Sequence, residues 1–310
     1  MICAPGNTGV ARLRAAEASD SEAIQAVLEA SVAHDNSGVW SRGGWSVAAW
    51  ATRTHVLEVD GRIVGLVAVR TEAAPDGAMP VRIALTASAR QAPLAVPLVQ
   101  GGVDLVHDAG GERARLFVPS RAKWIQTTAQ AAGFVRVRTI AHMLLPASAP
   151  TPATAPAHPA LNVRTIRPGE DERVLAALNR AWTGTWNFVS IPIEMLARDL
   201  DGHREGMLLG VEVDDPDHII ATCHGVFEPG QENPDGNPRA WISNVTVDPD
   251  FRGRGIARTM LTAGIEYLRA QGATSITLGV DADNPAPFRL YQSVGFEVLS
   301  SQEAWDKVLS

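Results

Sequence analysis

The chain has 310 residues, of which 45% are hydrophobic and 20% are charged, and its formal net charge is −7. This length suits two globular domains, and the acidic balance argues against nucleic acid and for a neutral or cationic small molecule as partner. No apolar run reaches the roughly 20 residues that span a membrane, and no signal-peptide pattern opens the sequence, so we expect a cytoplasmic location with no membrane contact.

The first half of the chain predicts a helix followed by a hairpin. Arg14 opens a short polar stretch that leads into a helix with Ile24, Val27 and Leu28 on its apolar face. Residues 55–70 are two strand-like runs joined by Asp-Gly, a pair typical of a tight hairpin turn. These elements indicate mixed helix and sheet from the start of the chain.

A Pro- and Ala-rich segment, 146–160, divides the chain into two halves that resemble each other. Its prolines and its lack of bulky apolar residues predict a semi-rigid linker between 1–145 and 161–310. Matching stretches follow in the same order on both sides, which we interpret as an internal repeat of one fold. The matching stretches are Arg14 with Arg167, 55–70 with 207–227, and 129–134 with 291–296.

A glycine loop between a predicted strand and a predicted helix stands out in the second half. The strand ends at Val247, and the loop reads Arg252-Gly-Arg-Gly255. The helix that follows has one apolar face, formed by Ile256, Met260, Leu261, Ile265 and Leu268. Glycines let the backbone approach an anion, and the N–H groups at a helix start attract it. The loop therefore predicts a pyrophosphate site, although it matches neither the Walker motif nor the dinucleotide fingerprint.

A second motif occupies residues 276–296. A strand leads to Asn284, a favourable N-cap, and Pro285 suits the first helical position because it has no N–H to lose. The helix carries Tyr291 and stops at Gly295, as glycine favours a helix end. The motif thus predicts a strand, a capped helix and a closing strand.

The pattern Arg252-x-x-Gly255-x-Ala257, followed by the Asn…Leu-Tyr…Gly-Phe motif of 284–296, resembles the two signatures of the GNAT superfamily of N-acetyltransferases. The resemblance covers residues 161–310 and implies an α+β fold, a mostly antiparallel mixed sheet flanked by helices. With the repeat, it implies two tandem GNAT folds, an arrangement similar to that of the mycothiol synthase family. It also implies acetyl-CoA as co-substrate.

The resemblance also assigns roles to residues of the second half. The backbone N–H of Val245 would face the thioester oxygen, and Tyr291 would protonate the leaving thiolate, as a phenol can. The alternative for Tyr291 is a core aromatic, and for Arg254 a solvated surface charge. Asn284 would bind the cofactor arm or cap its helix. The implied cofactor-binding set is Val245, Thr246, Val247, Arg252, Gly253, Arg254, Gly255, Ile256, Ala257 and Asn284.

The general base is not identified by the sequence. Many GNAT relatives carry a Glu at the start of the strand before the loop, where this chain has Trp241, and this puts mycothiol synthesis itself in doubt. His224 could act through water, or be a hydrogen-bonded edge histidine. Asp281 and Asp283 flank the second motif and could equally cap its turn. Loss of the amine proton to ordered water is the remaining option.

Trp182, Trp186 and Phe188 are the candidate substrate-binding residues. They lie between the first two helices of the second half, the region that closes over the acceptor in GNAT proteins. Their rings could form an apolar or cation-binding wall. Core packing explains them equally well, because the first half has its own tryptophans at the matching place, within 40–50.

The first half lacks the chemistry of the second. Segment 85–97 takes the place of the loop without a glycine, and Pro93 and Pro97 remove two N–H donors. Alanines replace the signature asparagine and tyrosine, at Ala122 and Ala129. We therefore expect a structural domain; a substrate-binding wall or an altered acyl-CoA pocket is the alternative.

The sequence thus predicts an N-acetyltransferase that moves the acetyl group of acetyl-CoA to a primary amine of a small molecule. Attack would be direct, in a ternary complex, because neither motif holds a cysteine for an acyl-enzyme. The alternatives are a peptide or protein N-terminus as acceptor, and a non-catalytic acyl-CoA-binding module. No metal is expected, since Cys3 and Cys223 form no metal motif, and the oligomeric state stays open.

Overall fold

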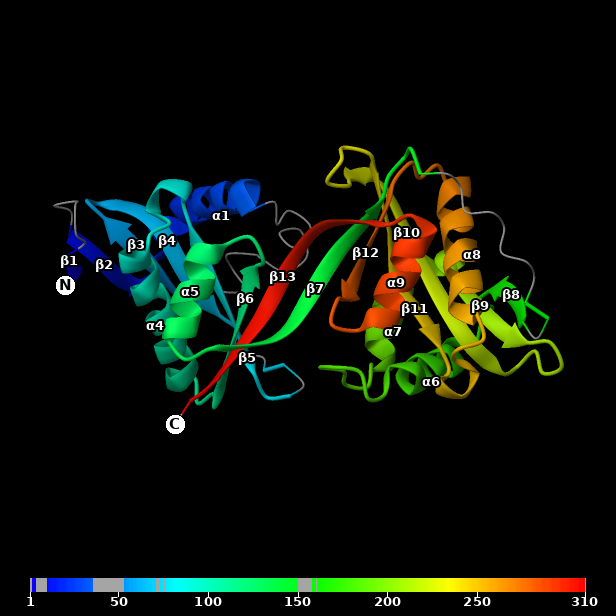
Figure 1. Cartoon of the computed structure of the whole chain (residues 1–310). Coiled ribbons are helices and arrows are strands. Elements are labelled where there is room, and N and C mark those ends of the chain that lie inside the picture. The colour runs from blue at the N-terminus through cyan, green and yellow to red at the C-terminus, as the bar shows by residue number, and fades with distance from the viewer. Residues whose placement is uncertain are drawn as a thin grey trace. The chain divides into compact units, whose positions relative to one another are not determined.

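The computed structural model describes residues 2–3, 10–35, 53–70, 73–74, 76–149, 158–159 and 161–309. These residues divide into two compact units, each with a sheet and flanking helices (Figure 1). The first unit takes the described residues up to Ala141, with Asp281–Asp283 and those from Ser300, and the second takes the rest. The tryptophans within 40–50 and most of the predicted linker lie outside the described residues.

The first unit is a mixed sheet that is mostly antiparallel, as expected. Strands β2 to β5 pair antiparallel in sequence order, and β6 runs parallel to β5. Asp60 and Gly61, both with positive φ, form the predicted hairpin turn. The elements are β1 (Ile2–Cys3), β2 (Val10–Ala15), α1 (Ser21–Asp35), β3 (Thr54–Val59), β4 (Arg62–Val69), β5 (Met79–Leu85), α4 (Ala92–Asp108), β6 (Arg113–Pro119), α5 (Lys123–Ala131) and β7 (Val135–Leu145).

The second unit repeats this order, which confirms the α+β fold class. Strands β8 to β11 pair antiparallel, and β12 runs parallel to β11. The elements are β8 (Leu161–Thr165), α6 (Asp171–Trp182), α7 (Ile193–Leu200), β9 (Met207–Glu212), β10 (Ile219–Glu232), β11 (Pro238–Val247), α8 (Ile256–Ala270), β12 (Ile276–Asp281) and α9 (Pro285–Val294). They are followed by β13 (Glu297–Val308), whose residues from Ser300 belong to the first unit.

Helices cover both faces of the sheet in the first unit. Alternate residues of β4 lie in two different hydrophobic cores, since successive side chains of a strand point to opposite faces of the sheet. Val67 and Val69 pack with the apolar residues of α4, whereas Leu66 and Ala68 pack with those of α1. The sheet is therefore the buried middle layer of a three-layer unit.

The last strand of the chain completes the sheet of the first unit. Residues 302–308 of β13 pair antiparallel with 113–119 of β6. Arg115, which is only 1% exposed, donates hydrogen bonds to Asp306 (2.7 Å) and to Asp76 (2.6 Å). A buried arginine requires such carboxylate partners, so this triad fixes the register of β13 on β6.

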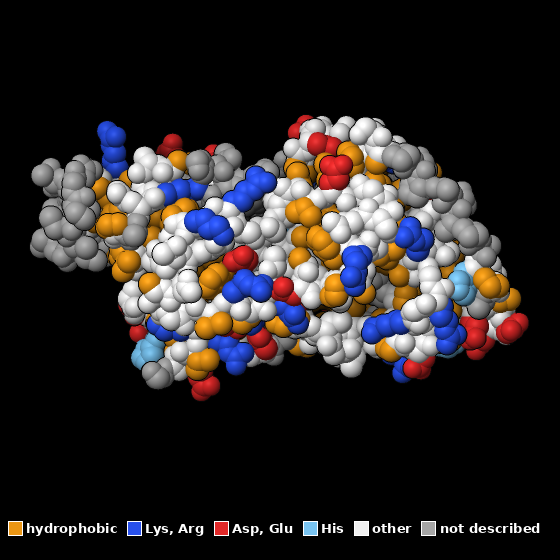
Figure 2. Space-filling model, viewed as in Figure 1, with side chains coloured by type: hydrophobic (Ala, Val, Ile, Leu, Met, Phe, Trp, Pro, Cys, Tyr) orange, Lys and Arg blue, Asp and Glu red, His pale blue; other side chains and the backbone are white. Residues whose placement is uncertain are grey.

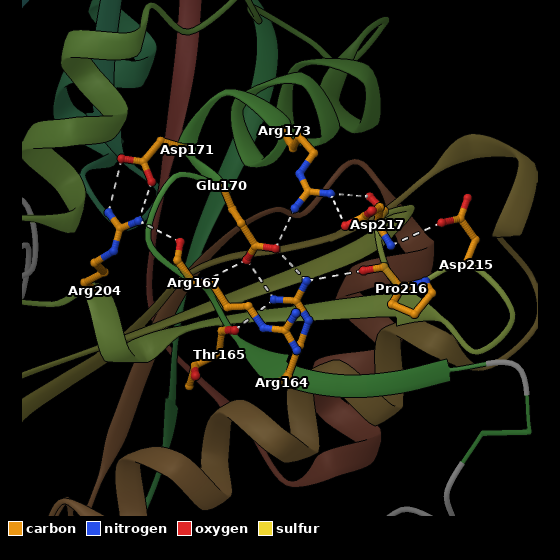
Figure 3. A network of polar contacts seen from close by, with 10 residues as sticks. All are labelled: Arg164, Thr165, Arg167, Glu170, Asp171, Arg173, Arg204, Asp215, Pro216 and Asp217. Atoms are coloured by element: carbon orange, nitrogen blue, oxygen red, sulfur yellow. Dashed lines mark hydrogen bonds and ion pairs between the residues drawn. The ribbon is translucent and has the colours of Figure 1, made fainter.

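A clasp between an arginine and a carboxylate joins the first strand to the first helix in both units. Arg14 binds Asp20 through two hydrogen bonds in the first unit, and Arg164 binds Glu170 in the same way in the second (Figure 3). The structure therefore aligns Arg14 with Arg164. The sequence comparison, which matched Arg14 with Arg167, was wrong by three residues because it followed residue type rather than the clasp.

The second clasp gives a prediction for stability. Hydrogen bonds from Arg164, and a charge interaction with Arg173, hold the pKa of Glu170 at about 2, below its ordinary 4.5. A lowered folded-state pKa stabilises the fold above pH 4.5, and this contribution is lost as the pH falls toward 2. We expect Glu170→Gln to lower the free energy of unfolding by about 2–3 kcal/mol at neutral pH, and by progressively less as the pH falls.

Urea denaturation at several pH values measures this effect. The matched control is Glu172→Gln, which changes an exposed carboxylate on the same helix and should cost less than about 0.5 kcal/mol. Equal losses for the two variants at neutral pH would show that the clasp contributes no more than a surface charge.

Candidate functional site

Strands β11 and β12 pair over a short distance and then diverge. Their parallel pairs are Trp241 with Thr277 and Ile242 with Leu278, and no further pair occurs among the described residues. The next residues of β11 are accessible, since Ser243 is exposed and Val245 is half-buried. Parting strands offer unpaired backbone groups to an extended ligand with amides of its own.

The register of β11 against β10 shifts at this same point. His224 pairs with Asn244, but the next residue of β10, Gly225, pairs with Ile242. Ser243 is therefore the extra residue of a β-bulge. The bulge lets Ser243 bond to His224 and Asn244 bond to Thr222, so neighbouring residues of β11 turn toward the same face of β10.

The predicted glycine loop lies between β11 and α8, at the end of the strand that parts. Gly253 and Gly255 have φ values of 78° and 84°, and a Cβ on either would meet no atom within 4 Å. Gly255 is the N-cap of α8, whose predicted apolar stripe is buried. Among the described residues, no acceptor is present for the N–H groups of 253–257, including those of Ile256 and Ala257. These exposed donors at a helix start can bind a phosphate group.

Arg252 holds the loop against the body of the unit. Its guanidinium donates to the carbonyl oxygens of Val247, at 3.2 Å, and Ala181. Arg90 in the first unit makes the equivalent two bonds, to the last residue of β5 and to α1. The bonds of Arg252 hold the start of the loop in place, and the predicted contact of Arg252 with the diphosphate stays a prediction.

Arg254 is exposed at the tip of the loop. Its guanidinium lies over the ring of Phe251, 5.0 Å from the ring centre, and donates to the carbonyl oxygen of Asp250. The ring of His158 contacts the carbonyl oxygen of Arg254 at 3.0 Å. The predicted role of Arg254 as a phosphate ligand stays a prediction.

The corresponding segment of the first unit has its backbone donors occupied. The N–H groups of 89–91 bond within the turn before α4, whereas those of 94 and 95 bond to the carbonyl oxygen of Gln91 just as those of Arg258 and Thr259 bond to that of Gly255. Pro93 has no N–H. A segment whose donors bond internally offers little to an anion, in contrast to 253–257.

Tyr291 of α9 is buried, with 8% of its surface exposed, and its ring meets Phe296 edge-on at 6.0 Å. Burial raises its pKa, with a smaller contribution from nearby Cys223, so the phenol keeps its proton at neutral pH. None of the hydrogen bonds among the described residues uses its hydroxyl. The core position and the predicted acid role are compatible, since a protonated phenol without a partner can donate.

The other polar residues of the second motif divide into structural and exposed groups. Asn284 takes the N-cap position of α9, but its side chain makes no capping bond and is exposed. Asp281 accepts from the N–H of Asp283, and Asp283 accepts from the N–H of Thr139 at 2.7 Å. Asp281 therefore bonds the backbone of its own turn and Asp283 bonds that of β7. The cofactor contact of Asn284 stays a prediction.

The three candidate substrate-binding aromatics lie at the surface of the second unit. Trp182 and Phe188 meet edge-on with ring centres 5.7 Å apart, and Trp186 is half-buried like them. None of the three belongs to the buried core between α6 and α7. Asn179 bonds the N–H and the carbonyl oxygen of Ile191 and so fixes the loop that carries the rings.

Trp241 occupies the position at which many GNAT relatives carry a glutamate, so no carboxylate is present there to act as the base. That ring lies under the guanidinium of Arg239, at 4.2 Å, and edge-on to His203. His224 is only 2% exposed, and burial lowers its pKa. It contacts the hydroxyl of Ser243 at 3.0 Å, a partner that the sequence did not indicate because the bulge is invisible there.

Surface charge and metal-ligating residues complete the description. On the face drawn in Figure 2, basic and acidic side chains of the described residues are interspersed with hydrophobic ones. In the described part of the chain, no group of three or more His, Cys, Asp or Glu side chains could hold a metal ion. None of the described helices is long and apolar enough to cross a membrane.

Comparisons with known proteins agree with this geometry. Residues 172–296 match the model of the acetyltransferase (GNAT) family. A mycothiol acetyltransferase of Thermobispora bispora is 31% identical over 204 residues, which are 62% of this chain and 64% of that protein, just under two thirds of its length.

Solved structures share the fold over nearly the whole chain. A GCN5-related N-acetyltransferase from Sphaerobacter thermophilus has a TM-score of 0.73 at 23% identity, covering 96% of this chain and 95% of that one. A tandem GNAT protein from the clavulanic acid biosynthesis pathway has a TM-score of 0.62 at 16% identity, covering 96% and 98%. Two GNAT-like folds in tandem, as the repeat predicted, therefore describe this chain.

Proposed function

We propose that the second unit, whose residues 172–296 match the model of the acetyltransferase (GNAT) family, transfers the acetyl group of acetyl-CoA to a primary amine of a small molecule. In this proposal 161–310 is the catalytic domain, 1–145 is a structural domain, and 146–160 links them. The acceptor attacks the thioester directly, with both substrates bound together.

The observation that carries the proposal is the continuity of the donor site along β11. The strand first parts from β12 and then leads into a loop whose N–H groups, from 253 to 257, have no acceptor among the described residues. An acyl-CoA has amides in its arm and a pyrophosphate beyond them, so its two halves match these two features in order.

The chemistry follows from groups along the same path. The N–H of Val245 would donate to the thioester oxygen, which becomes negative when the amine attacks. The C–S bond then breaks, and Tyr291 would give its proton to the departing thiolate. Its raised pKa keeps that proton in place until the thiolate forms.

The acceptor is proposed from the aromatic wall and from the named relatives. The rings of Trp182, Trp186 and Phe188 are partly accessible and can contact an apolar or cationic group. The name mycothiol acetyltransferase supports a small-molecule acceptor. Relatives with a glutamate at the position of Trp241 can use its carboxylate on their amine, and this chain cannot. We therefore propose the class of acceptor and not the compound.

Release of free thiol from acetyl-CoA in the presence of a panel of small amines tests the proposal. The expected result is thiol release that depends on an amine, with acetylation of that same amine detected by mass spectrometry. Tight acetyl-CoA binding without turnover on small amines or peptides would instead favour a non-catalytic acyl-CoA-binding module.

A further inference from the structure

A chain of directional hydrogen bonds ends at Ser243, where β11 parts from β12. The ring nitrogen Nε2 of His224 lies 3.3 Å from the carbonyl oxygen of His203. A carbonyl oxygen can only accept, so Nε2 carries the proton of the neutral ring. The other nitrogen, Nδ1, is then an acceptor, and the hydroxyl of Ser243, 3.0 Å away, donates to it.

The hydrogen bond between Ser243 and Asn244 also has a definite donor and acceptor. Thr222 donates to the amide oxygen of Asn244 at 3.0 Å, and Thr222 and Thr246 share a further bond of 2.7 Å. This orients the amide nitrogen of Asn244 toward the oxygen of Ser243, at 3.5 Å. The Ser243 oxygen therefore donates to His224, receives from Asn244, and keeps one lone pair for an outside donor.

Exposure shows where that outside donor can come from. His224 is 2% exposed, so no amine can reach its ring directly, whereas Ser243 is exposed. Ser243 is also the bulge residue, next after the last β11–β12 pair and two residues before Val245. Its free lone pair thus lies on the strand that is proposed to hold the thioester.

We propose that Ser243 and His224 form the proton relay that removes the amine proton during acetyl transfer, in place of the carboxylate that Trp241 lacks. The inference rests on the proposed function. The amine proton passes to the Ser243 oxygen as the Ser243 hydroxyl proton passes to Nδ1 of His224. Ser243 ends as a hydroxyl, and His224 ends as an imidazolium whose two N–H groups donate to Ser243 and to the carbonyl oxygen of His203.

The charged groups around His224 set the pH range of the relay. Burial is the largest influence and lowers the pKa of His224, and the nearby ring of His203 lowers it further, whereas the hydrogen bond to the His203 carbonyl and the charge of Asp199 raise it. Glu228 lies within 3.8 Å of His203 and can compensate a charge there. His224 is therefore neutral at neutral pH, and activity should fall as acid protonates it.

The main test is the pH dependence of turnover in the full chain. Ser243→Ala should lower kcat on the amine by about 100-fold while acetyl-CoA affinity stays unchanged. His224→Gln should have the same effect, and the double variant should be no slower than either, since the two act as one unit. In the parent chain, protonation of His224 should make kcat fall at low pH, and we call this part of the pH profile the acid limb. All three variants should lose it.

Two further variants separate the relay from a structural role. Ser243→Thr keeps a hydroxyl and should retain the acid limb, with kcat within about tenfold of the parent. Ser301→Ala, on β13 and outside the site, should change nothing. An unchanged kcat in Ser243→Ala, or an acid limb that survives there, overturns the relay.

A measurement without turnover keeps the relay testable if no amine in the panel reacts. The ¹⁵N shifts of the His224 ring, assigned by comparison with His224→Gln, should show the proton on Nε2 at neutral pH. A proton on Nδ1 would overturn the relay. Failure of the proposed function would look different, as absence of thiol release from the parent chain with every amine.

Discussion

Replacing Gly255 with glutamate is expected to abolish acetyl-CoA binding, a loss of at least about 100-fold or 2.7 kcal/mol in affinity. The residue has a φ of 84°, so a side chain there adds strain of about 1–2 kcal/mol. A Cβ would meet nothing within 4 Å, so the fold has room for it. The new carboxylate would then stand at the N-terminus of α8, where it repels a phosphate and competes for the same N–H groups.

Two matched variants separate charge from strain in this experiment. Gly255→Ala carries the strain at the same φ but no charge, and should retain most of the affinity. Gly236→Glu adds the same charge in the turn between β10 and β11, at a φ of 80° and with equally open space, and should bind normally. Calorimetric titration of all three chains with acetyl-CoA gives the comparison; an affinity unchanged by Gly255→Glu would refute the loop assignment.

Removing the hydroxyl of Tyr291 is expected to lower kcat by about 100-fold and to leave acetyl-CoA affinity within about threefold. The hydroxyl has no bond to any described residue, so Tyr291→Phe should keep the ring packing against Phe296 and the stability of the fold. Only the proton donor to the thiolate is lost.

The chain has two tyrosines, and the second supplies the control. Tyr267→Phe removes a phenol hydroxyl from α8 and should leave kcat unchanged. The measurement is steady-state thiol release with saturating amine. If Tyr291→Phe and Tyr267→Phe are equally active, Tyr291 is a core aromatic and another group protonates the thiolate.

The parts of the fold that depend on local pattern could be predicted from the sequence. The stripe of α8 follows from its 3.6-residue period, and each of its five members is at most 1% exposed. The hairpin at Asp60 and Gly61, and the stop of α9 at Gly295 with a φ of 107°, follow from turn chemistry that involves adjacent residues.

The parts that depend on distant partners could not be predicted. The bulge at Ser243 exists only in the register of β11 on β10, and a serine in a strand-like run gives no sign of it. The buried Arg115 is explained only by Asp76 and Asp306, which lie 39 and 191 residues away in the sequence. The bond of Arg252 to Ala181, which lies 71 residues away, also has no local sign in the sequence, and the predicted contact of Arg252 with the diphosphate stays a prediction.

The most direct test of the central claim is calorimetry of acetyl-CoA against the intact chain, with the stoichiometry as the result. One site per chain is predicted, because the N–H groups of 253–257 are open whereas those of 89–91 are bonded within their turn and Pro93 has no N–H. Two sites per chain would contradict the structural role proposed for the first domain. No binding at all would contradict the donor site on β11 and α8, and with it the proposed acetyl transfer.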